Sequence, residues 1–380
     1  MPLAVYVLGL SVFALGTSEF MLSGILQPLA RDMGVSIPQA GLLVSAFAIG
    51  MVVGAPVLAG ATLQLPRRTT LIGLLTVFGL GQVAGAAVAV SLVPVTARAR
   101  AMAVMVGGLS IANIAGVPAG ALLGQHAGWR SAFWAVAVLS AIGLIGVIAL
   151  VPRTAVPTGD ERPALRRELS IYRDKQVWLA LIGTALNGAA VFALFSYLAP
   201  LLTDTAGLSE GSVPTVLALF GVGALIGTFV GGRIADAHPF GTILGGIGAS
   251  ATVLTLLALT AHSPVAAVTL SLLLGVTAFT TAPALNARMF NVAHAAPTLA
   301  GATTTSAFNM GNTVGPWLGG LVIGAGWGYP AVAWTGALLA ALGVATTVVA
   351  LRLHRTRSAS RLVASSEDAR RAPVEASDRV

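Results

Sequence analysis

The 380-residue sequence contains no cysteine, which excludes disulfide bonds, a thiolate nucleophile and cysteine-ligated metal sites. Charged residues make up only 9% of the chain, against about 25% in a typical soluble domain. The five histidines are scattered without metal-like spacing. The apolar runs also lack paired catalytic acids, histidine clusters and Ser-Lys arrangements. These absences argue against an enzyme, and we expect neither a cofactor nor a metal.

The sequence is instead rich in apolar residues, at 56% of the chain, with a mean hydropathy of +0.89. A membrane-spanning helix needs about 20 predominantly apolar residues. Backbone groups in lipid must be satisfied internally, and no alternating barrel pattern is present, so each span should be a helix. The sequence therefore predicts an all-α polytopic membrane protein. The eleven apolar runs are 3–29, 39–63, 69–95, 101–125, 131–152, 176–202, 212–234, 239–261, 264–286, 299–323 and 329–351.

The net charge of +8 lies in short loops and in the C-terminal tail. This placement is typical of membrane topology and argues against nucleic-acid binding. We expect a multi-pass protein of the inner (cell) membrane with both termini in the cytoplasm. The predicted units are an N-terminal helical bundle at 1–152, a cytoplasmic linker at 153–177, a C-terminal helical bundle at 178–352 and a disordered tail at 353–380.

Glu19 is the only acidic residue inside the long apolar runs. Gly9, Gly16, Glu19, Ser23 and Gln27 are spaced 7, 3, 4 and 4 residues apart, which places them on one helix face. A charge at membrane depth is costly and is typical of a functional site. Glu19 is therefore predicted to face the bundle interior. The alternative is a carboxyl held by a neighbouring hydroxyl for packing alone.

The two halves of the chain share a repeat. The segment GVPAG at 116–120 is followed by Gly-Trp at 128–129, and GPWLG at 315–319 is followed by Gly-Trp at 326–327. Eleven residues lead from the proline to the tryptophan in both copies. Small residues alone favour helix packing, but two copies at one spacing indicate a duplication, which is typical of secondary transporters.

Several segments give the chain a family resemblance. GTSEFM at 16–21, GGRIAD at 231–236 and GVPAG at 116–120 resemble motifs of the major facilitator superfamily, in particular its twelve-span drug/proton antiporters. The stretch 2–27, together with TDTAG at 203–207, is most similar to the chloramphenicol-resistance exporters. The resemblance covers residues 1–352 and implies a two-bundle architecture with the substrate site between the bundles.

The resemblance implies export of a small amphipathic drug in exchange for protons, with Glu19 as the proton-coupling residue. The expected partners are the drug, protons and the lipid bilayer, and we expect a monomer. Arg233 and Asp236 would form a charge pair that clamps one conformation, although positive-inside anchoring explains the same residues. The residues of the conformational motifs are Arg233, Asp236, Gly116, Pro118 and Gly120.

A drug cavity should be mostly apolar with a few polar groups. The polar candidates are asparagines within the runs, and Phe195 is a candidate for stacking on an aromatic drug. Interhelical hydrogen bonds are the alternative role for the asparagines, and core or lipid packing is the alternative for Phe195. The predicted cavity residues are Asn113, Asn187, Phe195, Asn309 and Asn312.

The run 69–95 conflicts with this topology. Arginine pairs flank it on both sides, so the positive-inside rule demands an even number of crossings between them. Its 27 residues reach about 40 Å as one helix. If the run forms a helical hairpin instead, each of its two arms is about 20 Å long and does not cross the hydrocarbon core of about 30 Å. The similar exporters carry two helices here, so we predict a first bundle that lacks about one helix.

Two other functions stay open on the sequence alone. Export of sugars or nucleosides accompanies the same first-helix motif, although such a site would carry more polar side chains. The gap around 69–95 also leaves open a degenerate membrane protein that transports nothing.

Overall fold

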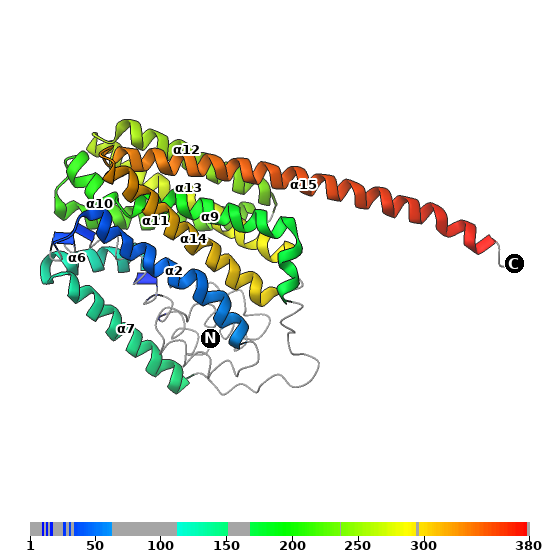
Figure 1. The fold of residues 1–380 in the computed structure, drawn as a ribbon, viewed down its shortest axis with the longest axis horizontal. Helices are drawn as coiled ribbons and strands as arrows, with labels where there is room; N and C mark the ends of the chain where they lie inside the picture. Colours follow the sequence, from blue (N-terminus) through cyan, green and yellow to red (C-terminus); the bar gives the residue numbers. More distant parts are fainter. Residues whose placement is uncertain are drawn as a thin grey trace.

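The computed structural model describes residues 10, 13, 16, 17, 26, 27, 30, 31, 34–62, 112–150, 168–235, 237–293 and 296–377. Within these residues the elements are helical and no strand occurs, which confirms the all-α prediction. Figure 1 shows long helices lying side by side, with the last helix projecting from one end of the bundle.

The second half forms a bundle of six long helices. Four of them begin with a proline, which fits the first turn because it has no N–H to leave unpaired. In this bundle α9 packs against α14 and α15, α15 against α12, α12 against α13, and α13 against α11. The helices are α9 (Lys175–Phe195), α11 (Val213–Ala235), α12 (Pro239–Thr260), α13 (Pro264–Val292), α14 (Pro297–Gly324) and α15 (Pro330–Ser377).

The predicted run 176–202 is not one helix. After α9 the chain turns at Ser196 and continues as the short helix α10 (Leu198–Pro200), the π-helix η4 (Leu201–Thr205) and the 3-10 turn η5 (Glu210–Ser212). Pro200 cannot donate a hydrogen bond to the carbonyl of Ser196, so a regular helix is interrupted there. Hydropathy could not reveal this break because the run is continuously apolar.

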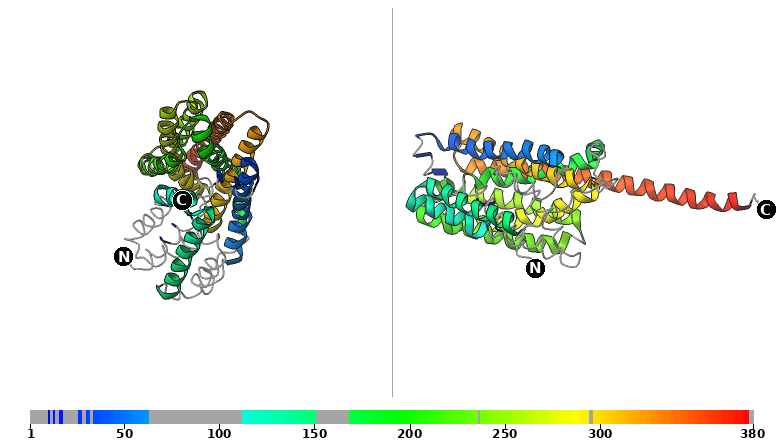
Figure 2. Two further views of the ribbon diagram at one scale, coloured as in Figure 1. Left: turned by 90° about the vertical axis from the view of Figure 1, so that its left-hand side faces the viewer. Right: turned by 90° about the horizontal axis from the view of Figure 1, so that it is seen from below.

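The described part of the first half contains α2 (Ile37–Thr62), the π-helix η2 (Ala112–Gly116), α6 (Val117–Ala127) and α7 (Trp129–Leu150). Helix α2 packs against α14, while η2 and α6 pack against α11; Figure 2 shows α2 running along α14. The second helix of each half therefore contacts the Gly-Pro segment of the other half. This reciprocity is what two related halves predict.

The Gly-Trp steps of the repeat form matching turns. Gly128 has φ 78° and Gly326 has φ 84°, in the region that glycine adopts without the strain of a β-carbon. Each turn precedes the last long helix of its half that the structure describes, α7 or α15. The repeat seen in the sequence therefore corresponds to a repeated turn.

The C-terminal tail differs from the expected disordered segment at 353–380. Helix α15 continues without a break to Ser377 and extends away from the bundle (Figure 1). Six arginines and five alanines lie between 352 and 376, and both residue types favour helix. Low apolar content indicated the absence of packing partners, but it did not indicate the absence of helix.

Large apolar side chains cover the outside of the bundle. Examples are Phe229 at 60% exposure, Leu259 at 64% and Val265 at 76%. Among the described residues, five helices are long and apolar enough to cross a membrane. Exposed apolar surface on this scale is expected where lipid replaces water as the solvent.

Glycine allows α11 and α13 to approach closely. Gly223, Gly227 and Gly231 lie four residues apart on α11. A β-carbon at each would collide with the backbone carbonyl of Leu272, Val276 or Thr280 on α13. Such small-residue contacts drive helix association in membranes.

We expect Gly227→Ala to destabilise the bundle, because the new methyl group has no space against the Val276 carbonyl. Overpacking of this kind costs about 1–3 kcal/mol. The matched control is Gly232→Ala on the same helix, where no atom lies within 4 Å of the added carbon. Thermal unfolding of the purified protein in detergent should show a lower Tm for Gly227→Ala only. Equal Tm values would show that α11 and α13 can separate without loss.

Candidate functional site

The first-helix motif and the Gly-Pro motif lie against each other. Gly16, Thr17 and Gly116 are all buried. A β-carbon at Gly116 would collide with the Thr17 side chain, whose Oγ1 is its nearest neighbour. Two motifs 99 residues apart in the sequence therefore form one contact, at the level of the bundle where Glu19 is expected.

Glu19 itself lies outside the described residues, so its role stays a prediction. The described residue Thr17, two positions before Glu19, shows what kind of environment this motif has. Thr17 is only 5% exposed, and its Oγ1 has no hydrogen-bond partner among the described residues. A buried hydroxyl without a partner is costly and is the kind of group that a polar ligand would satisfy.

The predicted asparagines on α9 and α14 come together. Asn187, Asn309 and Asn312 are all buried, at 6%, 2% and 2% exposure. Gly188 lets the two helices meet, because a β-carbon there would lie 3.0 Å from the Phe308 carbonyl oxygen and 3.5 Å from Asn312 Oδ1. The three side chains therefore belong to one helix pair.

Among the described residues, Asn309 uses only the donor end of its side-chain amide. Its Nδ2 donates to the Thr305 carbonyl at 3.0 Å, while its Oδ1 has no partner among the described residues. An asparagine that served only to join helices would use both ends of its amide. The Nδ2 bond stays within α14, and the cavity role of Asn309 stays a prediction.

Phe195 lies in the apolar core of the second half at 2% exposure. Its ring is 4.6 Å from that of Phe220 on α11 and 5.7 Å from that of Phe192. Phe192 in turn contacts Phe308 of α14 at 5.7 Å, and Phe220 contacts Phe279 of α13 at 6.1 Å. The sequence did not reveal this chain of five rings, because its members lie on four helices and share no spacing.

The other predicted residues are described only in part. Asn113 lies in the π-helix η2, which packs against α11, but its side chain is outside the described part. Arg233 is exposed in the last turn of α11, where a cation interacts favourably with the helix C-terminus. Asp236, its expected partner, is outside the described residues. Pro118 and Gly120 are buried in the first turn of α6.

A polar cluster near the linker was missed by the sequence analysis. Helix α13 continues to Val292, beyond the predicted end at 286, and so brings Arg288 into the bundle at 5% exposure. Its Nη2 donates to Gln176 Oε1 at 3.1 Å, and its guanidinium lies 5.1 Å from the Phe240 ring centre. Within the described residues Arg288 forms no ion pair, and burial of a cation without a carboxylate is uncommon. Hydropathy alone could not place Arg288 inside a helix.

The linker holds the start of α14. The Glu168 carboxylate accepts a hydrogen bond from the Leu299 backbone N–H at 2.8 Å and is buried. The first turn of a helix has unpaired N–H groups and a partial positive charge, which an anion satisfies. The end of the predicted linker is therefore a fixed part of the second bundle, and α9 begins at Lys175, three residues before the predicted boundary at 178.

Comparison with known proteins decides the family. The sequence model of the Major Facilitator Superfamily matches residues 77–308, more than half of the chain. The chain belongs to the major facilitator superfamily. The predicted resemblance and the two-bundle helical fold class are thereby confirmed, and the protein is a multi-pass membrane transporter.

Two relatives align over almost the whole chain. A chloramphenicol resistance protein of Streptomyces lividans is 38% identical over 375 residues, with 90% of this chain and 95% of that protein covered. The inner membrane transport protein YdhP of Escherichia coli K12 is 34% identical, with 91% and 95% covered. Because 90% of this chain is about 342 residues, about thirty positions of the first alignment have no counterpart here.

Solved structures show the same fold. The human organic anion transporter MFSD10 superposes with a TM-score of 0.61 at 18% identity, covering 90% of this chain and 98% of that one. A bacterial homologue of the human lysosomal transporter Spinster gives a TM-score of 0.58 at 16% identity, covering 91% and 94%. This major facilitator protein therefore shares their architecture.

Proposed function

We propose that this transporter exports a small amphipathic drug of the chloramphenicol type across the inner membrane, in exchange for protons and by alternating access. Glu19 would carry the proton. The drug would lie between the two halves and contact the paired asparagines of α9 and α14. The protein would act as a monomer in the lipid bilayer.

The observation that carries the proposal is the 38% identity to a chloramphenicol resistance protein along almost the whole of both chains. The site offers two further supports. The contact between Thr17 and Gly116 joins the first-helix motif to the Gly-Pro motif. Asn309 Oδ1, which has no hydrogen-bond partner among the described residues, offers a polar group of the kind that a drug site requires.

The test is drug susceptibility of Escherichia coli cells that lack their main drug exporters and express this chain. We expect a higher inhibitory concentration of chloramphenicol than in cells with an empty vector. Everted vesicles should accumulate labelled chloramphenicol when energised, and a protonophore should abolish this accumulation. Accumulation that survives the protonophore would contradict proton exchange, and no accumulation of any tested amphipathic drug would contradict drug export.

Export of sugars or nucleosides is the second candidate function. Such substrates carry many hydroxyl groups, and their sites need a matching number of polar side chains. Within the described residues, the polar groups on α9 and α14 are accompanied by a chain of phenylalanines. The same vesicles, loaded with labelled sugars and nucleosides, would reveal this activity directly.

A third outcome is a protein that transports nothing. The missing helix was predicted around 69–95, which lies outside the described residues. The alignment deficit of about thirty positions is of the length of one membrane-spanning helix and its loop. If the first bundle is incomplete, export will be weak or lost relative to the Streptomyces lividans protein measured side by side at equal expression.

We expect the N-terminus, the linker and the C-terminal tail to be cytoplasmic. In this arrangement nineteen of the 21 lysines and arginines lie inside, and only Arg31 and Arg130 lie outside. A reporter enzyme that works only in the cytoplasm should be active when fused after Arg361, and one that works only in the periplasm should be inactive there. A fusion active only in the periplasm would overturn this orientation and the direction of the proposed export.

A further inference from the structure

The two halves meet at the end of the bundle that lies farthest from the linker. Helix α9 starts beside the linker at Lys175, and its continuation through α10 and η4 reaches this far end at Thr205. In Figure 1, α10 and α6 lie at this end, opposite the end from which α15 projects. Residues 26, 27, 30 and 31 of the first apolar run contact the second half here.

An apolar layer closes this end. From the first half Leu26, Ala30 and Ala40 pack against Tyr197 of the α9 break and Val332 of α15. All five are buried, with exposures of 3% or less. A dry contact of this kind blocks water and solutes between the halves.

Tyr197 fixes the layer at its centre. Its hydroxyl donates to the Pro316 carbonyl on α14 at 2.9 Å. Gly41 of α2 and Gly320 of α14 lie beside this hydroxyl, and β-carbons there would come within 2.5 Å and 2.9 Å of it. Glycine at these positions lets a first-half helix and a second-half helix enclose one ring.

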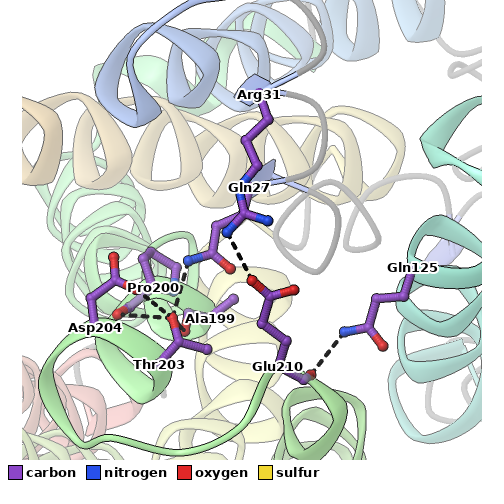
Figure 3. Close-up of polar contacts among 8 residues, drawn as sticks. All are labelled: Gln27, Arg31, Gln125, Ala199, Pro200, Thr203, Asp204 and Glu210. Carbon is purple, nitrogen blue, oxygen red and sulfur yellow. Dashed lines mark hydrogen bonds and ion pairs between the residues drawn. The ribbon is translucent and has the colours of Figure 1, made fainter.

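First-half residues next in sequence to those of the apolar layer contribute to a polar layer, whose contacts are drawn in Figure 3. Gln27 Nε2 donates to Thr203 Oγ1 at 3.1 Å, and the Thr203 hydroxyl donates to Asp204 Oδ1 at 2.7 Å. Arg31 Nη2 pairs with Glu210 Oε1 at 2.8 Å. Two first-half side chains four positions apart are thus bound to η4, through Thr203, and to η5, through Glu210.

Neighbouring elements complete this polar layer. Gln125 of α6 donates to the Glu210 backbone carbonyl at 2.8 Å, so two separate first-half elements hold the same second-half segment.

Burial, the charge of Asp204 and a hydrogen bond with its carboxylate raise the pKa of Tyr329 to about 12. Tyr329 therefore stays protonated at physiological pH.

We propose that these two layers form a gate at the outer end of the transporter, closed in this structure, with Arg31–Glu210 and Gln27–Thr203 as the contacts that break when it opens. This inference rests on the proposed function, because opening of the gate is one step of the export cycle. The irregular segment from Ser196 to Thr205 supplies the joint, because interrupted and π-helical turns bend more readily than a regular helix.

The exposure of the Arg31 and Glu210 side chains indicates how strongly their ion pair should affect gate opening. The Arg31 and Glu210 side chains are 67% and 56% exposed, and exposed ion pairs contribute little individually. The apolar layer therefore holds most of the closed state, while the polar contacts shift the balance. Reversal of one charge should raise the open fraction by about two- to fivefold.

The first test measures opening without any drug. The sequence has no native cysteine, so Leu26→Cys places a single thiol in the buried layer, and an impermeant maleimide added to intact cells reports its access. Arg31→Glu or Glu210→Arg should speed this labelling by about two- to fivefold, and the double reversal should restore the original rate. Unchanged labelling in both single reversals would overturn the gate.

The controls separate gating from orientation and folding. His262 is exposed in the turn between α12 and α13, at the same end of the bundle. His262→Cys should label at one rate in all charge backgrounds. Restoration by the double reversal shows that the faster labelling arises from the charge pair, and an unchanged His262→Cys rate shows that the single variants are folded. If His262→Cys labels only after permeabilisation, this end faces the cytoplasm and an outer gate is excluded.

The second test locks the gate. Arg31→Cys with Glu210→Cys should be joined by a short bifunctional thiol reagent, because side chains that meet end to end are too far apart at their α-carbons for a direct disulfide. Cross-linking with a reducible reagent should stop drug accumulation in vesicles, and reductant should restore it. The same reagent should not change the accumulation shown by either single cysteine variant. Full transport after cross-linking would contradict the gate, while absence of transport before cross-linking would contradict only the proposed function.

Discussion

Replacement of Glu19 by glutamine is expected to abolish proton-driven drug accumulation while the protein remains in the membrane. Glu19 is the only acidic residue in the apolar runs, and because a charge at membrane depth is costly, such a residue is typical of a functional site. Glutamine preserves size and hydrogen bonding but cannot release a proton. Accumulation in energised vesicles should therefore fall to background, a loss of more than about tenfold.

Drug exchange separates proton coupling from drug binding. Vesicles that contain Glu19→Gln and are preloaded with unlabelled drug should still exchange it for labelled drug. Exchange requires the drug site to alternate between the two sides of the membrane, but it requires no net proton transfer. Glu367→Gln in the C-terminal tail provides a matched acid-to-amide control and should leave accumulation intact. If Glu19→Gln still builds a drug gradient that collapses with a protonophore, the proton site lies elsewhere.

The sequence predicted the helical framework well where composition and local chemistry act together. The starts of α12, α13 and α14 at Pro239, Pro264 and Pro297 lie within two residues of the predicted runs, because proline both ends the preceding loop and fits the first helical turn. The sequence did not predict the helix ends that lie beyond the apolar region. Neither the end of α13 at Val292 nor the continuation of α15 to Ser377 has a hydrophobicity signal.

The contacts of the candidate site could not be predicted from the sequence. The motifs around Thr17 and Gly116 were both found, yet small side chains carry no information about which partner they face. The contact between them arises from the packing of whole helices. The outer gate was missed for the same reason, since Arg31 and Glu210 are 179 residues apart and each resembles an ordinary loop charge.

The contact between the two motifs leads to the other large expected effect. We expect Gly116→Ala to reduce drug export by about tenfold or more, because its new methyl group would collide with the Thr17 side chain and push the first helix away, at a cost of about 1–3 kcal/mol. The first helix carries Glu19, so a shift of this helix would displace the proton-coupling group from its site. Vesicle accumulation at equal protein level measures the loss.

A second substitution should reverse this loss if steric contact is its cause. Thr17→Ala removes the hydroxyl and methyl groups that the new side chain would meet and leaves the Thr17 β-carbon as the nearest atom, at 3.0 Å, a distance that a small helix shift can absorb. The double variant Gly116→Ala with Thr17→Ala should therefore export better than Gly116→Ala alone. Gly50→Ala in α2, where no atom lies within 4 Å, controls for the change from glycine to alanine in a first-half helix. If the double variant is no better than Gly116→Ala, the glycine is required for backbone bending in the π-helix rather than for its contact with the first helix.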